Sequence, residues 1–560
     1  MSLQDAPRAL LTMGRAGLLR PVNPLHLMDA GKALRRWGVS YAGGIAAAAA
    51  LHPHDVFVVD DAGSLTWAEM DRRSNALAHA LGRRGIGRGD LVAVLSRNHR
   101  GFIDATAALA KIGADTLYLN TGFAGPQLRE VLAREQPVAV IYDEEFTDLV
   151  GDGADVAIRI LSWAGPPGPP PARPARSARG AKEAPSGPVS RPSASAAAAA
   201  AIPTIDELIG EGPDTPPPPS GRVGRTIILT SGTTGTPKGA PREQTSGVNP
   251  AVSMLDRIPY RQGEVTLVPA PLFHSWGFGN LTMGLLLNST FVLHRHFDPE
   301  SVLADIQAHR ANVLVAVPVM LQRILELPAR TRSRYDTSSL RIVPLSGSSI
   351  PAGVVTRWMD EFGDNLYNLY GSTEVGWVSI ATPSDLRRDP RTAGRPPLHT
   401  SVRVLDDDGR QVPAGEVGRI FVKSELLFDG YTGGGKKEVV DGYMSTGDTG
   451  RFDDGLLYVE GRDDEMIVSG GENVFPREVE DLLSAHPDVV ESAVIGVPDD
   501  EFGQRLKAFV VVRDGATLDA DAVKAHVHKN LARFKVPRDV ELVAEIPRNA
   551  TGKILKNHLT

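Results

Sequence analysis

The stretch that decides the fold is Thr230-Ser-Gly-Thr-Thr-Gly-Thr-Pro-Lys-Gly239, which follows the apolar run Ile227-Ile-Leu229. The apolar run is typical of a buried strand, so the stretch is predicted to be the loop that leaves it. Glycines let successive backbone N–H groups converge on an anion, while the hydroxyls and Lys238 add donors and positive charge. The stretch therefore predicts a phosphate-binding loop, although a Ser/Thr/Gly-rich surface turn would have the same composition. The Walker pattern G-x-x-x-x-G-K-[ST] is absent from it.

Composition bounds the kind of protein that carries this loop. The chain has 560 residues, of which 42% are hydrophobic and 23% charged, and its formal net charge is −7. This length predicts more than one domain, and the acidic balance argues against a nucleic-acid surface. The chain has no cysteine, which excludes disulfides, thiolate metal sites and a cysteine nucleophile.

The N-terminal region leaves two interpretations open. No apolar run is long enough to span a membrane and no signal-peptide pattern is visible, so we expect a cytoplasmic protein. Residues 1–50 are rich in Ala and Leu, with arginines at Arg8, Arg15, Arg20, Arg35 and Arg36. They form either a basic amphipathic segment in peripheral contact with a membrane or a helix packed on the core.

Strands and helices then alternate as in an α/β sheet. Thr66-Trp-Ala-Glu69 is a capping box that predicts a helix, with Met70, Leu77 and Leu81 on one face. Strands are expected at 91–95, 138–141 and 156–161, with a helix at 102–112. Residues 165–201 break this pattern with Pro, Ala, Arg, Ser and Gly, and we interpret them as a disordered insertion.

The pattern of expected secondary structure changes twice further along the chain. After the loop, strands are expected at 264–269, 313–317 and 340–345, whereas the apolar stretch 281–287 could line a deep tunnel or be a core helix. Beyond residue 402, short strands separated by Asp408-Gly409, Asp441-Gly442 and Asp454-Gly455 predict hairpins. From residue 467 the pattern is α+β, with a helix at 476–483 that has Pro in its first turn.

Five further segments accompany the loop. They are Phe273-His-Ser-Trp276, Leu345-Ser-Gly-Ser-Ser349, Tyr370-Gly-Ser-Thr-Glu374, Ser445-Thr-Gly-Asp448, and Gly461-Arg-Asp-Asp-Glu465 together with Pro547-Arg-Asn-Ala-Thr-Gly-Lys553. In this order they resemble the adenylate-forming superfamily of acyl-CoA synthetases, peptide-synthetase adenylation domains and luciferases. The resemblance covers about residues 66–556 without the insertion. The sequence pattern is similar to that of bacterial fatty-acyl-CoA synthetases in particular.

The resemblance implies an ATP-dependent reaction in two steps. A carboxylic acid attacks the α-phosphate of ATP, which gives an acyl-AMP and pyrophosphate, and the acyl group then passes to CoA. It also implies an α/β fold with a large N-terminal domain of several subdomains at 1–461, a hinge at 462–464 and a small mobile α+β domain at 465–560.

Roles for the nucleotide-binding residues follow from the resemblance. The loop, with Thr230, Ser231, Gly232, Thr233, Thr234, Gly235 and Lys238, would hold the β- and γ-phosphates. Glu374 would hold Mg²⁺ and Thr373 would bond the α-phosphate. Tyr370 and the segment Gly347, Ser348 and Ser349 would flank the adenine, next to Gly371 and Ser372. Asp448 and Arg462 would hold the ribose, and Lys553 would bridge the carboxylate and phosphate oxygens.

Three of these residues also have a plainer interpretation. Asp448 could be a turn residue, Glu374 a charge at a helix N-terminus and Lys553 a solvated lysine of the tail. Lys556 stands where the superfamily more often has Arg.

The remaining residues bear on the acid and on CoA. His274, Trp276, Phe278 and Gly376 are expected in the acid pocket, although His274 could equally be a satisfied core histidine. Amino-acid-activating relatives typically have Phe-Asp where this chain has Phe273-His274, so a plain acid is expected, with a medium or long fatty acid favoured. Alternatives are a ligase that loads an acyl carrier protein and a catalytically silent AMP-binding protein.

Two sites in the C-terminal part would serve the second step. Asp464 is expected to be the pivot of a rotation that replaces Lys553 by the thiol of CoA. Gly470 and Gly471, which lack side chains, would let the pantetheine arm pass, or they are only a turn.

Overall fold

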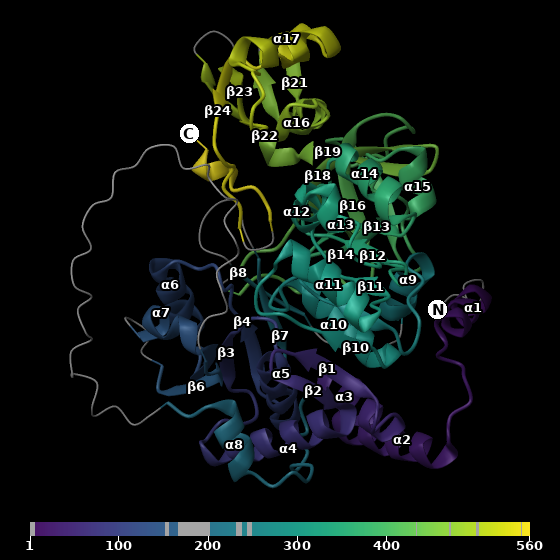
Figure 1. Cartoon of the computed structure of the whole chain (residues 1–560), viewed down its shortest axis with the longest axis vertical. Coiled ribbons are helices and arrows are strands. Elements are labelled where there is room, and N and C mark those ends of the chain that lie inside the picture. Colours follow the sequence, from purple (N-terminus) through teal and green to yellow (C-terminus); the bar gives the residue numbers. More distant parts are fainter. Residues whose placement is uncertain are drawn as a thin grey trace.

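The structure is a computed structural model that describes residues 6–151, 156–165, 202–230, 238–242, 249–432, 434–469, 472–499, 503–549 and 552–559. It is an α/β protein with a large N-terminal part and a small C-terminal domain, which lies at the top of Figure 1. The expected fold class is thereby confirmed. The predicted insertion at 165–201 lies, apart from Gly165, outside the described residues.

The first sheet has six strands in the order β6-β5-β3-β4-β7-β8, and all pairs except β7 with β8 are parallel. Its strands are β3 (Leu91–Leu95), β4 (Asp115–Tyr118), β5 (Ala139–Asp143), β6 (Ile158–Trp163), β7 (Thr226–Thr230) and β8 (Lys238–Arg242). Its helices are α4 (Trp67–Arg83), α5 (Arg100–Ile112), α6 (Gly125–Glu135), α7 (Thr147–Gly151) and α8 (Ile205–Glu211). The capping box forms as predicted, and Met70, Leu77 and Leu81 are fully buried.

The second sheet has the order β11-β9-β10-β1-β2 and shares one hydrophobic core with the helices of the first. Its strands are β1 (Val56–Asp60), β2 (Gly63–Thr66), β9 (Val265–Leu267), β10 (Thr290–Val292) and β11 (Val313–Leu314). The helices of this region are α9 (Asn249–Arg257), α10 (Ser275–Leu287), α11 (Pro299–His309), α12 (Pro318–Glu326) and α13 (Ala329–Arg332). The apolar stretch 281–287 is the second half of α10.

Three helices precede these sheets. They are α1 (Ala6–Ala16), α2 (Pro24–Trp37) and α3 (Tyr41–Leu51), so the N-terminal region is helical and partly packed on the core. In the part of the chain that the structure describes, no helix is long and apolar enough to cross a membrane.

Two smaller sheets complete the N-terminal part. One contains β12 (Val343–Leu345), β13 (Leu366–Ser372) and β14 (Gly376–Ala381), flanked by α14 (Ala352–Phe362) and α15 (Pro383–Arg388). The other is antiparallel, with β15 (Ser401–Leu405), β16 (Gly418–Lys423), β17 (Val439–Val440), β18 (Tyr443–Asp453) and β19 (Leu456–Arg462). Asp441-Gly442 and Asp454-Gly455 form its tight turns with positive φ at both residues, as Asp-Gly hairpins require.

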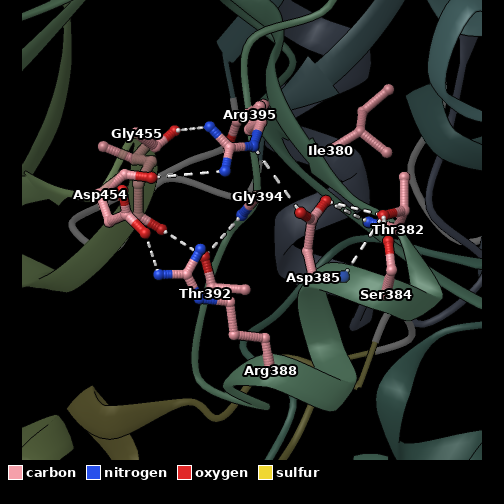
Figure 2. Close-up of polar contacts among 12 residues, drawn as sticks. Ile380, Thr382, Ser384, Asp385, Arg388, Thr392, Gly394, Arg395, Asp454 and Gly455 are labelled. Atoms are coloured by element: carbon pink, nitrogen blue, oxygen red, sulfur yellow. Dashed lines mark hydrogen bonds and ion pairs between the residues drawn. The ribbon is translucent and has the colours of Figure 1, made fainter.

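A polar network fixes the turn between β18 and β19 against α15 (Figure 2). The Arg395 guanidinium donates to the backbone carbonyls of Gly455 at 3.1 Å and Asp454 at 3.3 Å, and it lies 3.8 Å from Asp385. Arg388 pairs with the Asp454 carboxylate. Because Asp448 and Arg462 lie on this hairpin, the network helps to fix their position.

The C-terminal domain has its own five-stranded sheet and core. Its strands are β20 (Ile467–Ser469), β21 (Glu472–Val474), β22 (Val489–Asp499), β23 (Gly503–Val512) and β24 (Asp539–Leu542), and its helices are α16 (Pro476–Ser484) and α17 (Ala520–Asn530). It contacts the large part directly. Arg477 donates to the Val459 carbonyl at 2.9 Å, and the Gln322 amide donates to the Val490 carbonyl at 3.2 Å.

Candidate active site

A cavity of about 1070 Å³ lies where the two parts of the molecule meet. It brings together most of the residues that the sequence singled out. Those that line it are Lys238, His274, Trp276, Gly347, Ser348, Ser349, Tyr370, Gly371, Ser372, Thr373, Glu374, Gly376, Asp448, Arg462 and Lys553.

The remaining candidates lie elsewhere or outside the described residues. Thr230 ends β7, and Asp464 lies in a short 3₁₀ turn, Asp463–Glu465, directly after β19. Phe278 is not among the residues that line the cavity. Ser231, Gly232, Thr233, Thr234, Gly235, Gly470 and Gly471 lie outside the described residues.

A partly buried carboxylate, Asp448, forms one wall of the cavity. The Tyr370 hydroxyl donates to Asp448 over 2.5 Å, and Arg462, opposite Asp448 across the β18–β19 hairpin, has Nη1 3.9 Å from its Oδ1. Burial raises the pKa of Asp448, against the opposing effects of the Tyr370 hydrogen bond and of Arg462. Burial, together with the neighbouring Asp448, also raises the pKa of Tyr370. Tyr370 therefore stays a neutral donor, and Asp448 keeps one oxygen for a hydroxyl-bearing ligand.

A second carboxylate, Glu374, lines the cavity on the turn between β13 and β14. Glu374 accepts hydrogen bonds from the Ser372 hydroxyl at 2.8 Å and from the Tyr431 hydroxyl at 3.0 Å. The Lys238 ammonium lies 5.6 Å from the centre of the Tyr431 ring, a cation–π contact. Tyr431 thus contacts both the acidic and the basic group of this wall.

The turn that carries Thr373 and Glu374 depends on glycine. A Cβ on Gly371 would lie 2.0 Å from the Gly376 carbonyl oxygen. Gly376 has φ +71°, and a Cβ there would lie 2.6 Å from the Leu426 Cβ. Only glycine allows β13 and β14 to approach so closely, and this approach aims the turn into the cavity.

Lys553 reaches the cavity from the other domain on a tight loop. Its backbone N–H donates to the Asn549 side chain, and its carbonyl accepts from the Asn549 N–H, both at 2.9 Å. The Arg548 guanidinium donates to the Gly552 carbonyl at 2.6 Å and pairs with Glu491 on β22. Gly552 has φ +78° and lies against α12, where a Cβ would come within 2.4 Å of the Val319 Cγ1. The loop therefore fits closely against the large part of the molecule.

The third part of the cavity has apolar and neutral walls. His274 directly precedes α10 without a side-chain capping bond, and burial lowers its pKa to about 4, so its imidazole is neutral near pH 7. Its Nε2 is buried without a hydrogen-bond partner among the described residues. Trp276 donates its indole N–H to the Ala316 carbonyl at 3.0 Å, and Val317, Val319 and Trp377 add apolar surface.

Phe278 and the leucines of α10 belong to the core instead. The Phe278 ring lies 5.8 Å from the ring of Tyr41 and 5.1 Å from that of Tyr118, measured between centroids. Leu281, Leu285 and Leu287 are buried, and from α10 only residues up to Gly279 line the cavity. Of the two alternatives for the stretch 281–287, a tunnel lining and a core helix, the structure therefore has the core helix.

Several lining residues were not predicted. Tyr431 and Lys437 lie between β16 and β17 without a recognisable motif, and Arg477 is the second residue of α16. Lys556, noted only for standing in place of Arg, has its ammonium 3.0 Å from both Glu465 and Glu480. These carboxylates raise its pKa although burial opposes the charge.

The donor set limits how a metal could bind. Among the described residues no three His, Cys, Asp or Glu side chains cluster as a metal-binding group. Within the described part of the chain, Glu374 thus belongs to no such group. One carboxylate combined with substrate phosphates is the usual way in which proteins hold Mg²⁺, so the residues fit a metal that arrives with a nucleotide.

Comparisons with known proteins agree with this architecture. Residues 45–432 match the AMP-binding enzyme family and residues 478–553 match the AMP-binding enzyme C-terminal domain. The chain is 33% identical to a feruloyl-CoA synthase of Amycolatopsis over 91% of this chain and 96% of that protein. It is 30% identical to a long-chain-fatty-acid–CoA ligase of Mycobacterium tuberculosis, over 88% of this chain and 92% of that one.

A solved structure has the same fold over nearly its whole length. It is the ATP-bound MatB of Rhodopseudomonas palustris, 28% identical, with a TM-score of 0.75, covering 90% of this chain and 95% of that chain. The fold and the site thus define a two-domain nucleotide-dependent enzyme. The chain belongs to the AMP-binding enzyme family.

Tyr431→Phe tests whether the hydrogen bond from Tyr431 orients the Glu374 carboxylate for metal binding. Loss of a hydrogen bond to a carboxylate that contacts a metal weakens metal binding about 10–100-fold in comparable sites. We expect the Mg²⁺ concentration for half-maximal pyrophosphate exchange to rise about tenfold, with the protein still folded. Tyr443→Phe, which removes a hydroxyl hydrogen-bonded to Ser401 away from the cavity, is the matched control. Equal Mg²⁺ dependence in both variants would contradict the role of Tyr431.

Gly552→Ala tests whether the loop of Lys553 must lie against α12. The added Cβ meets Val319, so the loop should lift and acyl-adenylate formation should fall at least tenfold. Gly515→Ala is a matched control, because Gly515 also has positive φ (+83°) but has open space around its Cβ position. Single-turnover formation of the adenylate is the measurement. If the two variants lost the same activity, backbone strain rather than the contact would be responsible.

Proposed function

We propose that the protein is an ATP-dependent acid–CoA ligase that activates a carboxylic acid as an acyl-AMP and transfers the acyl group to CoA. The observation that carries the proposal is that Lys238, Glu374, Asp448 and Lys553, from two domains, line one cavity together with the apolar pocket at Trp276. This set supplies groups for phosphates, a metal, a ribose and a reacting carboxylate in a single space.

In the first step, the acid attacks the α-phosphorus of ATP and pyrophosphate leaves. Negative charge grows on oxygens that begin as anions, so the chain must supply positive charge and fixed donors. Lys553 neutralises the carboxylate and α-phosphate oxygens, Thr373 donates to the α-phosphate, and Asp448 accepts from the ribose hydroxyls. The neutral His274 closes the acid side without a charge that would trap the carboxylate.

Mg²⁺ fits at Glu374, where it would neutralise phosphate oxygens as the pyrophosphate departs. The chain's own contribution there is orientation. Ser372 and Tyr431 each donate to one Glu374 oxygen, so the carboxylate keeps a fixed direction toward the cavity. The loop that contains Lys238 would bind the outer phosphates.

The second step needs a thiol from outside, because the chain has no cysteine. Lys553 occupies the approach to the acyl carbonyl, so the C-terminal domain must move before CoA can enter. Asp464 is our proposed pivot, since it follows the last strand of the large part and precedes β20. The proposed domain boundaries are 1–461, 462–464 and 465–560, with Gly470 and Gly471 as the proposed pantetheine path.

We propose a medium- or long-chain fatty acid as the substrate. Trp276, Val317 and Val319 offer apolar surface, and Phe273-His274 has no carboxylate for a substrate ammonium. The likeness to a long-chain-fatty-acid–CoA ligase supports the proposal.

An aromatic acid is the second candidate. Two indole rings, Trp276 and Trp377, line the cavity, and the leucines of α10 do not extend it into a tunnel. The likeness to a feruloyl-CoA synthase favours the same class.

A panel of acids separates these candidates. Pyrophosphate exchange is measured with octanoate, palmitate, ferulate and indoleacetate, followed by AMP release with free CoA or with an acyl carrier protein. We expect exchange with an apolar acid and AMP release with free CoA. Exchange without CoA-dependent AMP release would favour a carrier-loading ligase, and no exchange with any acid would leave a silent AMP-binding protein.

Two substitutions separate the half-reactions. Lys553→Ala should slow adenylate formation about 100-fold or more, the scale of losing a charge-stabilising group, while thioester formation from pre-made acyl-AMP persists. Asp464→Pro restricts the proposed pivot and should do the reverse. Lys529→Ala, on the exposed side of α17, and Asp464→Ala, which keeps backbone freedom, are the controls. Equal slowing of both steps in both variants would contradict a rotation between two conformations.

A further inference from the structure

The N-terminal helices expose an unusual amount of apolar surface. Among the described residues, sixteen large hydrophobic side chains are exposed, and nine of them lie between residues 10 and 39. They are Leu10, Leu11, Leu19, Val22, Leu25, Leu27, Met28, Leu34 and Val39. Isolated exposed leucines are ordinary on protein surfaces, but a concentration of this kind marks a contact surface.

Each helix buries one side and leaves the other free. Ala9, Thr12 and Ala16 of α1 are buried, and Ala9 packs with Val252 of α9 and with Leu398. Ala30 and Trp37 are the buried residues of α2, which packs along α3. The packed sides therefore account for the folding of both helices without the exposed leucines.

Helix α2 exposes apolar side chains around its buried residues Ala30 and Trp37. Leu27 and Leu34 are seven residues apart and so lie on the same face, at the edge of the packed side that carries Ala30 and Trp37. Met28 lies on the side of α2 opposite the buried Ala30, and the exposed fractions of Leu27, Met28 and Leu34 are 56%, 59% and 41%. Leu25, in the first turn, is 67% exposed.

The same region is strongly basic, whereas the chain as a whole carries −7. Residues 6–39 contain six cationic side chains, Arg8, Arg15, Arg20, Lys32, Arg35 and Arg36, and one acidic residue, Asp29. Arg8 pairs with Asp256 and Lys32 with Asp29. Arg15, Arg20 and Arg35 are exposed and make no ion pair with any described residue.

We propose that α1 and α2, with the segment between them, form a docking surface for an anionic lipid bilayer. An interfacial helix buries leucines at the level of the acyl chains while its arginines reach lipid phosphates. This surface offers both elements, and its positive charge is complementary to an anionic membrane. In Figure 1 the two helices lie along the right and lower edge of the molecule, away from the C-terminal domain at the top.

A second copy of the chain is a poorer occupant of the same surface. A symmetric dimer would place this surface against itself and so oppose two sets of unpaired arginines. Anionic lipids remove that repulsion. Charge thus favours the bilayer over self-association.

Vesicle binding by the unaltered protein is the first test. Vesicles of phosphatidylglycerol and phosphatidylcholine, compared with phosphatidylcholine alone, are separated from free protein by flotation. We expect at least tenfold more protein bound to the anionic vesicles, and a loss of this difference at 1 M salt, where charges are screened within about 3 Å. Equal or negligible binding to both kinds of vesicle would overturn the proposal.

Two sets of variants then identify the surface. Arg15→Glu, Arg20→Glu and Arg35→Glu together should reduce binding at least tenfold, since each basic residue contributes about a factor of five. Leu27→Gln, Met28→Gln and Leu34→Gln keep helix-forming residues and should also reduce binding. None of these residues lines the cavity, so the rate in detergent-free solution should stay unchanged, which also reports correct folding.

Matched controls carry the same changes elsewhere. Arg310, Arg330 and Lys529 changed to Glu alter the net charge equally, and Val417, Val439 and Leu542 changed to Gln remove exposed apolar side chains on other elements. Both controls should bind as the unaltered protein does. The proposal is overturned if controls and test variants lose binding equally. It is also overturned if the Gln variant changes the protein from dimer to monomer while vesicle binding stays the same.

Discussion

The hydrogen bond between Tyr370 and Asp448 joins the parts on which the site depends. Tyr370 belongs to the three-stranded sheet, Asp448 to the antiparallel sheet, and Arg462 to the last strand before the C-terminal domain. Because Asp448 is largely removed from solvent, its charge depends on neighbours such as Tyr370 and Arg462. The Arg395 network in Figure 2 fixes the same hairpin from outside. The two sheets must therefore hold their relative position for the site to exist.

The C-terminal domain is held internally by a comparable constraint. Lys556 bridges Glu465, beside the proposed pivot, and Glu480 on α16, so the start of the domain is tied to its first helix. The loop of Lys553 is tied to β22 through Arg548 and Glu491. These contacts lie within one domain, whereas Gly552 packs closely against Val319 of the large part. A domain built in this way can move as a unit, because its own ion pairs need not break.

The predictable parts of the fold are those decided by neighbouring residues. The Thr66–Glu69 capping box forms because donor and acceptor lie one turn apart, whatever the tertiary context. The turns at Asp441-Gly442 and Asp454-Gly455 form because these residues tolerate positive φ. Part of the cavity lining was also predictable, since short motifs with glycines and charges mark backbone that must approach a ligand. How Asp448 and Tyr370 contact each other was not, because they are 78 residues apart.

Phe278 shows the limit of predicting cavity residues from local sequence spacing. It follows His274 by one helical turn, so both residues are expected on the same face of α10, and His274 does line the cavity. Tyr41 and Tyr118, from α3 and β4, cover the Phe278 ring and remove it from the cavity. Local spacing thus defines a face of the helix, but residues more than 100 positions away decide where the cavity ends on that face. Tyr431 was not predicted for the same reason, because its place in the site depends on a hydrogen bond to Glu374 that no local sequence pattern encodes.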